Sequence, residues 1–123
     1  MLQKSGIDVI GTLDEPIHAI NLRETIEKCK NRFVIALDAC LGSINESVGY
    51  INIQKGPLRP GTGVNKNLPA IGNVQIIGIV NVGGFMEYMV LQNTCLGLVM
   101  KMAEIIADII KEVVSLKLNE TVE

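Results

Sequence analysis

The sequence has few aromatic residues and no excess of positive charge. Its 123 residues include two tyrosines, two phenylalanines and no tryptophan, and 11 lysines and arginines face 13 aspartates and glutamates. Proteins that bind nucleic acids need a basic surface to neutralise phosphates and aromatic rings on which bases stack. We therefore expect no nucleic-acid partner.

Cysteine and histidine are also scarce. The three cysteines are odd in number and widely spaced, which fits neither a disulfide framework nor the paired spacing of a zinc site. The single histidine, His18, argues against a zinc peptidase with HExxH spacing. We predict reduced thiols, as in a cytoplasm, and no bound cofactor.

The sequence shows neither a secretory signal nor a long uninterrupted apolar run. Polar residues follow Met1–Lys4, where a signal peptide would have its apolar core. The apolar region from Phe85 to Ile110 is interrupted by charged and amide residues before the roughly 18 apolar residues of a membrane span accumulate. We expect a cytoplasmic protein without membrane association.

Apolar residues nevertheless make up 48% of the chain, enough for a single domain over residues 1–123. The apolar runs Phe33–Leu37 and Val74–Val80 are typical of strands that are covered on both faces. Val48–Ile53 and Ile7–Ile10 are weaker strand candidates. This pattern predicts a sheet with at least two buried strands.

Two segments have the features of helices. Asn21 and Glu24 have the spacing of a capping box, which predicts a helix at about residues 21 to 31. Apolar residues recur with a helical period from Phe85 to about Leu118, followed by a frayed tail at Asn119–Glu123. Strands that alternate with helices predict an α/β fold, namely a three-layer αβα sandwich with a mostly parallel sheet.

Asp38 follows the apolar run Phe33–Leu37, so we expect its carboxylate at the tip of a buried strand. Open α/β sheets place their functional groups at such tips. Nearby apolar residues would raise the pKa of this carboxyl by desolvation. The alternative is that Asp38 only caps the turn that follows.

The segment Lys55–Pro69 is long for a loop in so small a domain, and three prolines stiffen it. Its Gly61-x-Gly63 pair lacks the third glycine and the Walker spacing of a phosphate-binding loop. The loop either lines a binding cleft or simply uses its glycines for turns. Asn81 ends another apolar run, and Cys40 is expected to be a buried thiol and not a nucleophile.

Several motifs resemble known families. Val34–Ala39, Pro60–Asn65 and Ile77–Val80 resemble, in the same order, the core of the spore germination protease. The similarity to the sporulation protein YyaC family, described as a spore protease, is closer and covers nearly the whole chain. It rests on Gly11–Leu13, Pro16–Ala19, Gly56–Gly61, Gly83–Tyr88 and Leu91–Thr94.

The resemblance implies a fold of the phosphorylase/hydrolase type and an aspartic-type endopeptidase of the forespore that acts on small spore proteins or a sporulation precursor. Asp38 falls on the second of two catalytic carboxylates in the germination protease, and His18 would assist it. The substrate-binding residues would be Pro60, Gly61, Thr62, Gly63, Asn65 and Asn81. The first carboxylate belongs to a segment without a counterpart here, so we expect a truncated form that lacks the N-terminal strand.

An aspartic mechanism needs one protonated and one ionised carboxyl group, and a single aspartate cannot supply both. The alternative is therefore a non-catalytic binding or assembly protein of sporulation. A missing neighbouring strand would leave a free sheet edge, which predicts a homo-oligomer. A divalent metal contact through Asp38 and His18 remains a further alternative.

Overall fold

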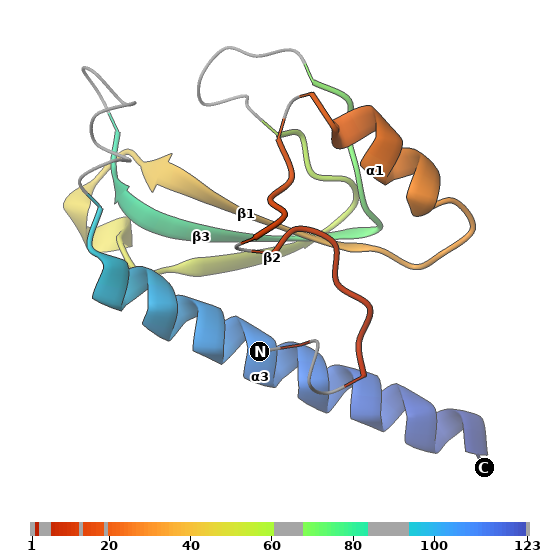
Figure 1. Ribbon diagram of the computed structural model, residues 1–123. Helices are drawn as coiled ribbons and strands as arrows, with labels where there is room; N and C mark the ends of the chain where they lie inside the picture. The colour runs from red at the N-terminus through yellow and green to blue at the C-terminus, as the bar shows by residue number, and fades with distance from the viewer. Residues whose placement is uncertain are drawn as a thin grey trace.

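The computed structural model describes residue 2 and residues 6–12, 14–18, 20–60, 68–83 and 94–122, with side chains as far as residue 116. It is a small α/β structure with a single three-stranded sheet among these residues. The elements, in chain order, are α1 (Leu22–Lys28), β1 (Ile35–Gly42), the short 3-10 helix η2 (Asn45–Ser47), β2 (Ile51–Lys55), β3 (Val74–Val82) and α3 (Leu96–Val122) (Figure 1).

The sheet is mixed and not mostly parallel, which corrects the prediction. Its order is β1-β3-β2, with β3 parallel to β1 and antiparallel to β2. Parallel neighbours need a long crossover connection, usually a helix. The described part of the β2–β3 connection contains no helix but an isolated antiparallel bridge between Leu58 and Ile71. This hairpin-like return places β2 antiparallel to β3.

The central strand β3 matches its prediction, whereas β1 differs from it. Ile76, Ile79 and Val80 of β3 are buried, because β3 has a neighbouring strand on each side. In contrast, β1 is an edge strand. Phe33, expected to begin it, lies before the strand and is 73% exposed, and Leu37 is 48% exposed. The expectation that β1 is buried on both faces is therefore wrong.

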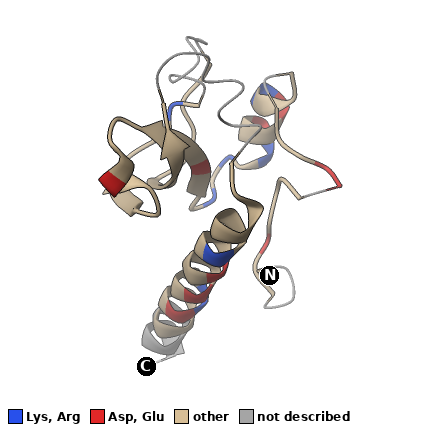
Figure 2. Ribbon diagram, turned by 90° about the vertical axis from the view of Figure 1, so that its left-hand side faces the viewer, with Lys and Arg blue, Asp and Glu red and all other residues tan. Residues whose placement is uncertain are grey.

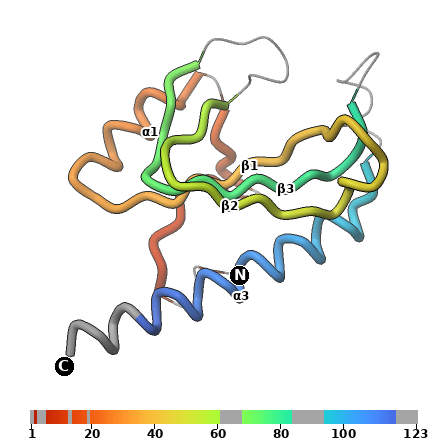
Figure 3. Tube along the Cα trace, turned by 180° about the vertical axis from the view of Figure 1, so that it is seen from behind, coloured from red at the N-terminus to blue at the C-terminus, as the bar shows by residue number. Residues whose placement is uncertain are grey.

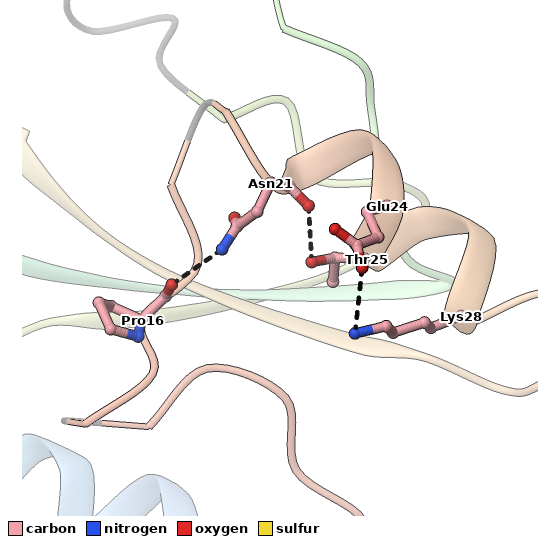
Figure 4. Close-up of polar contacts among 5 residues, drawn as sticks. All are labelled: Pro16, Asn21, Glu24, Thr25 and Lys28. Atoms are coloured by element: carbon pink, nitrogen blue, oxygen red, sulfur yellow. Dashed lines mark hydrogen bonds and ion pairs between the residues drawn. The ribbon is translucent and has the colours of Figure 1, made fainter.

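The predicted helix near residue 21 is present as α1, but the capping box is not formed. Asn21 makes no side-chain cap to the helix. Its Oδ1 accepts a hydrogen bond from the His18 N–H at 2.8 Å. Its Nδ2 donates to the Pro16 carbonyl at 3.1 Å, as Figure 4 shows. Glu24 instead forms an exposed ion pair with Lys28 at 3.6 Å. Asn21 thus fixes the segment that enters α1.

The long helix α3 packs against the sheet through Met102, Ala107 and Ile110, all of which are buried. A Cβ atom on Gly78 of β3 would lie 3.0 Å from the terminal methyl of Met102, so this glycine permits a close approach of the helix. Figures 1 and 3 show α3 below the sheet and α1 above one end of it. The helix was predicted from Phe85 but begins at Leu96, because Thr94 and Cys95 are not helical, and residues 85–93 lie outside the described residues. It continues to Val122, so the predicted frayed tail is wrong.

One other expectation about the architecture is wrong, because Ile7–Ile10 forms no strand. The described residues form a small α/β arrangement in which α1 has 7 residues and α3 has 27. The three-layer sandwich stays a prediction. Acidic and basic residues are interspersed over the described ribbon (Figure 2). Within that part of the chain, no helix has the length and apolar content needed to cross a membrane.

Candidate functional site

Asp38 lies within β1 and not at its tip, because the strand continues to Gly42. Its neighbour across the ladder is Ile77 of β3. The residue is exposed to solvent, yet the protein atoms around it desolvate the carboxyl and raise its pKa. The Ala39 N–H donates to Asp38 Oδ1 at 2.9 Å and partly opposes this increase in the pKa. The protonated form is therefore favoured relative to a free aspartate.

Asp38 lines a cavity of about 820 Å³. Two other predicted site residues, His18 and Pro60, line the same cavity, although the three are far apart in the sequence. Apolar side chains from β1, α3 and the segment before α1 form much of the remaining wall, including Leu37, Ile110 and Ile10. The fold thus places one carboxyl group with a raised pKa beside a mainly apolar cavity.

His18 and Pro60 reach the cavity from loops. His18 is exposed and lies in the segment that Asn21 holds against α1. Pro60 lies in a turn just after the isolated bridge between Leu58 and Ile71. Leu58 is buried, so the bridge ties this part of the loop to the rest of the fold.

The other predicted substrate-binding residues fall into two groups. Gly61, Thr62, Gly63 and Asn65 lie outside the described residues. Asn81 does not end its strand as predicted but lies inside β3, where its Oδ1 accepts a hydrogen bond from the Val82 N–H at 2.8 Å. It pairs with Leu41 after an irregularity in the β1–β3 ladder and is not among the residues that line the cavity.

Asp8 and Arg32 line the cavity but were not predicted as site residues. Their side chains form an ion pair, and Asp8 raises the pKa of the Arg32 guanidinium. Both side chains are largely exposed. No local motif marks either residue: Asp8 lies in a strand-like run, and Arg32 follows a helix that is rich in charged residues. Only the fold brings them to the cavity.

Cys40 lies two residues after Asp38 and is half-buried. Burial raises the pKa of its thiol, and the Asp38 carboxylate adds to this effect. A thiol with a raised pKa is a poor nucleophile at neutral pH. Among the described residues, no three histidine, cysteine, aspartate or glutamate side chains are grouped so that they could hold a metal ion. The arrangement of these residues therefore supports acid–base chemistry at Asp38.

The fold and cavity define a small α/β protein with an ionisable carboxyl on an edge strand. Residues 1–109 match the family model described as "Protein of unknown function (DUF1256)". The chain is 53% identical over 111 residues to the "Uncharacterized protein YyaC" of Bacillus subtilis (strain 168). The chain therefore belongs to this family, and the predicted membership of the YyaC family is confirmed.

The match to the Bacillus subtilis protein includes 87% of this chain and 54% of that protein. The chain thus spans about half the length of the curated relative that it matches. No solved structure matches the chain. The resemblance to the spore germination protease and to a phosphorylase/hydrolase-type fold is tested by none of these matches.

Proposed function

We propose that the chain is a hydrolase of the spore germination protease type that cleaves peptide bonds with the help of Asp38. The observation that carries this proposal is the placement of Asp38, with a raised pKa, in the wall of a cavity that His18 and Pro60 also line. Perturbed carboxyl groups in cavities are candidates for acid–base catalysis. The family resemblance supplies the phosphorylase/hydrolase-type fold and the aspartic mechanism.

Asp38 would act as the general acid in this reaction. Hydrolysis forms a bond between a water oxygen and the carbonyl carbon and breaks the C–N bond. A carboxyl group that retains its proton closer to neutral pH can donate it to the leaving amine, and the proton that the water loses restores the carboxyl group. Desolvation favours this protonated form. His18 would assist at the same cavity. Small spore proteins or a sporulation precursor in the forespore are the proposed substrates, as the resemblance implies.

Two matched variants test this role with a library of internally quenched peptides. Asp38→Asn removes the transferable proton and should lower the rate of cleavage by at least about a hundredfold, the smaller end of general acid–base effects. Asp108→Asn makes the same change on α3 at an exposed residue outside the cavity and should leave the rate unchanged. Cleavage that is equally fast in wild type and Asp38→Asn would exclude Asp38 as the acid.

A second candidate function is peptide binding without hydrolysis, in a binding or assembly protein of sporulation. Among the described residues, the carboxylates that line the cavity are Asp8 and Asp38, and Asp8 forms an ion pair with Arg32. An aspartic mechanism requires two cooperating carboxyl groups. Binding of a library peptide without cleavage by wild type would favour this second function.

A further inference from the structure

Asn21 holds both main-chain groups of His18. Its side-chain Oδ1 accepts a hydrogen bond from the His18 N–H at 2.8 Å, and its own N–H donates to the His18 carbonyl at 3.1 Å. Its Nδ2 also donates to the Pro16 carbonyl at 3.1 Å (Figure 4). These bonds fix the peptide groups on both sides of the His18 Cα atom, and with them the direction in which the His18 side chain leaves the backbone.

Asn21 is in turn anchored to the buried side of α1. The Asn21 carbonyl accepts a hydrogen bond from the Thr25 N–H at 3.0 Å. It also accepts from the Thr25 hydroxyl at 2.9 Å, as Figure 4 shows. Thr25 and Leu22 are 5% and 4% exposed, and both line the same cavity as His18. The placement of His18 at the cavity therefore depends on the buried side of α1 through one intermediate residue.

The side chain of Asn21 departs from the usual role of an asparagine at this position. An asparagine before a helix ordinarily accepts a hydrogen bond from an N–H of the first turn. Asn21 makes no such cap. An aspartate could accept from the His18 N–H but has no N–H to donate to Pro16, so both ends of the amide are used here. Departures from local rules are expected mainly at functional sites.

The cavity contains few ionisable groups that could donate an N–H to a bound peptide. Among the described residues, the ionisable side chains that line it are Asp8, His18, Lys28, Cys29, Arg32 and Asp38. The lysine and the arginine of this set are both engaged in ion pairs with carboxylates. The His18 imidazole is outside these pairs. Within this set, it is therefore the N–H donor that is available to a bound carbonyl.

We propose that Asn21 is a positioning residue, which holds His18 at the cavity so that the imidazole N–H donates to the carbonyl oxygen of the scissile peptide bond. That oxygen gains negative charge as water adds to the carbonyl carbon, and a donor already in place stabilises the charge. His18 transfers no proton in this step, and the proton of the leaving amine comes from Asp38. The inference rests on the proposed function, because it assigns the contact that His18 makes with the substrate.

A double-mutant cycle tests the link between Asn21 and His18 on a peptide that the wild type cleaves. His18→Ala should lower kcat by about a hundredfold and change KM by less than about twofold, because the contact strengthens only in the transition state. Asn21→Ala should lower kcat at least about tenfold by misplacing His18. The double variant should be no slower than His18→Ala, because Asn21 acts through His18. A double variant that is slower by the product of both single losses overturns the proposal.

Two further variants separate positioning from a general loss of structure. Asn21→Asp keeps an acceptor for the His18 N–H and loses only the exposed bond to Pro16, so its kcat should stay within about threefold of the wild type. Asn45→Ala makes the same truncation as Asn21→Ala at an exposed asparagine of η2 outside the cavity, and kcat should not change. An Asn21→Asp variant as slow as Asn21→Ala overturns the proposal.

Amide hydrogen exchange at His18, measured by NMR, tests the positioning without substrate. The His18 N–H donates to Asn21 Oδ1, so its exchange should be at least about tenfold faster in Asn21→Ala than in the wild type. Asn21→Asp should exchange at close to the wild-type rate. Equal exchange in the wild type and Asn21→Ala overturns the positioning.

The outcomes separate this inference from the proposed function. Faster His18 exchange in Asn21→Ala, where the wild type cleaves no library peptide, supports the positioning and contradicts hydrolysis. Cleavage that is unchanged in both His18→Ala and Asn21→Ala supports hydrolysis and overturns this inference. If Asn21→Ala fails to fold, as judged by circular dichroism, an unchanged kcat in His18→Ala still overturns it.

Discussion

At the scale of the residue, Asp38 shows how a strand position changes the chemistry of a carboxyl group. It is exposed, but its backbone belongs to a sheet, and the surrounding protein removes enough water to raise its pKa. Its Oδ1 accepts a hydrogen bond from the adjacent Ala39 N–H. An isolated aspartate on a loop would have neither feature. We therefore expect the stability of this protein to depend on pH through Asp38.

The difference in stability between wild type and Asp38→Asn should depend on pH. The pKa of Asp38 in the folded chain is raised above 3.8, so the folded state binds its proton more tightly than the unfolded state. This contribution favours folding most below pH 3.8, and the advantage is lost as the pH rises through the raised pKa. Asparagine lacks this titration, and its Oδ1 can still accept the Ala39 N–H.

We therefore expect Asp38→Asn to be more stable than wild type by about 0.5 kcal/mol at neutral pH, a small value because the side chain is exposed. The two proteins should approach equal stability near pH 3. Urea denaturation at both pH values measures the difference. A wild type that is the more stable protein at neutral pH would contradict the assigned direction of the pKa shift.

At the scale of the element, β1 and β3 have similar apolar sequences but different environments. Ile76, Ile79 and Val80 of β3 are buried between neighbours, whereas Leu37 of β1 is 48% exposed. Residues of a central strand are covered by both adjacent strands, and an edge strand has one such neighbour. An apolar run therefore predicts a strand more reliably than it predicts the position of that strand in the sheet.

The attachment of α3 to the sheet can be tested at Met102. This side chain is 5% exposed, and its methyl group lies against Gly78 of β3. Met102→Ala should lower the free energy of unfolding by about 2 to 5 kcal/mol, because it leaves a cavity in the core. Met100→Ala is the control on the same helix, where the side chain is 44% exposed, and it should change stability by less than about 0.5 kcal/mol. Equal losses in chemical denaturation would place Met102 outside the core.

At the scale of the whole molecule, many large apolar side chains remain in contact with solvent. Among the residues whose side chains the structure describes, those that are more than half exposed are Ile20, Phe33, Ile44, Tyr50, Ile53, Leu96 and Leu116. Single exposed apolar residues are normal, but extended apolar surfaces usually mark sites of association. These side chains therefore offer surface that association of chains could bury.

We expect the isolated chain to form a homo-oligomer. Burial of exposed apolar surface favours association, and the effect grows with protein concentration. Light scattering coupled to size-exclusion chromatography, over a range of loading concentrations, gives the mass in solution. A mass of one chain at every concentration would contradict this prediction.

Much of the local structure could be predicted from the sequence. The helical period of α3, the apolar run of β3 and the strand near residue 51 all appear, because short-range periodicity and burial on both faces leave clear patterns. The end of β1 and the role of Asn21 could not be predicted. Whether Asp38 ends a strand depends on a partner strand some forty residues away, and Asn21 bonds to Pro16 and His18 instead of capping its helix.

Both the sequence and the tertiary structure were needed to find the residues of the candidate site. Asp38, His18 and Pro60 were chosen by motif and family resemblance, and these need only the order of residues along the chain. Asp8 and Arg32 carry no such signal and reach the cavity only through the fold. The sequence by itself determined the family, the two helical regions and three of the four predicted strand segments, because these follow from local composition and residue spacing. Only the tertiary structure decided that Asp38 lies on the edge strand of the described sheet and in the wall of a cavity, because strand order and cavities arise from contacts between residues that are distant in the chain.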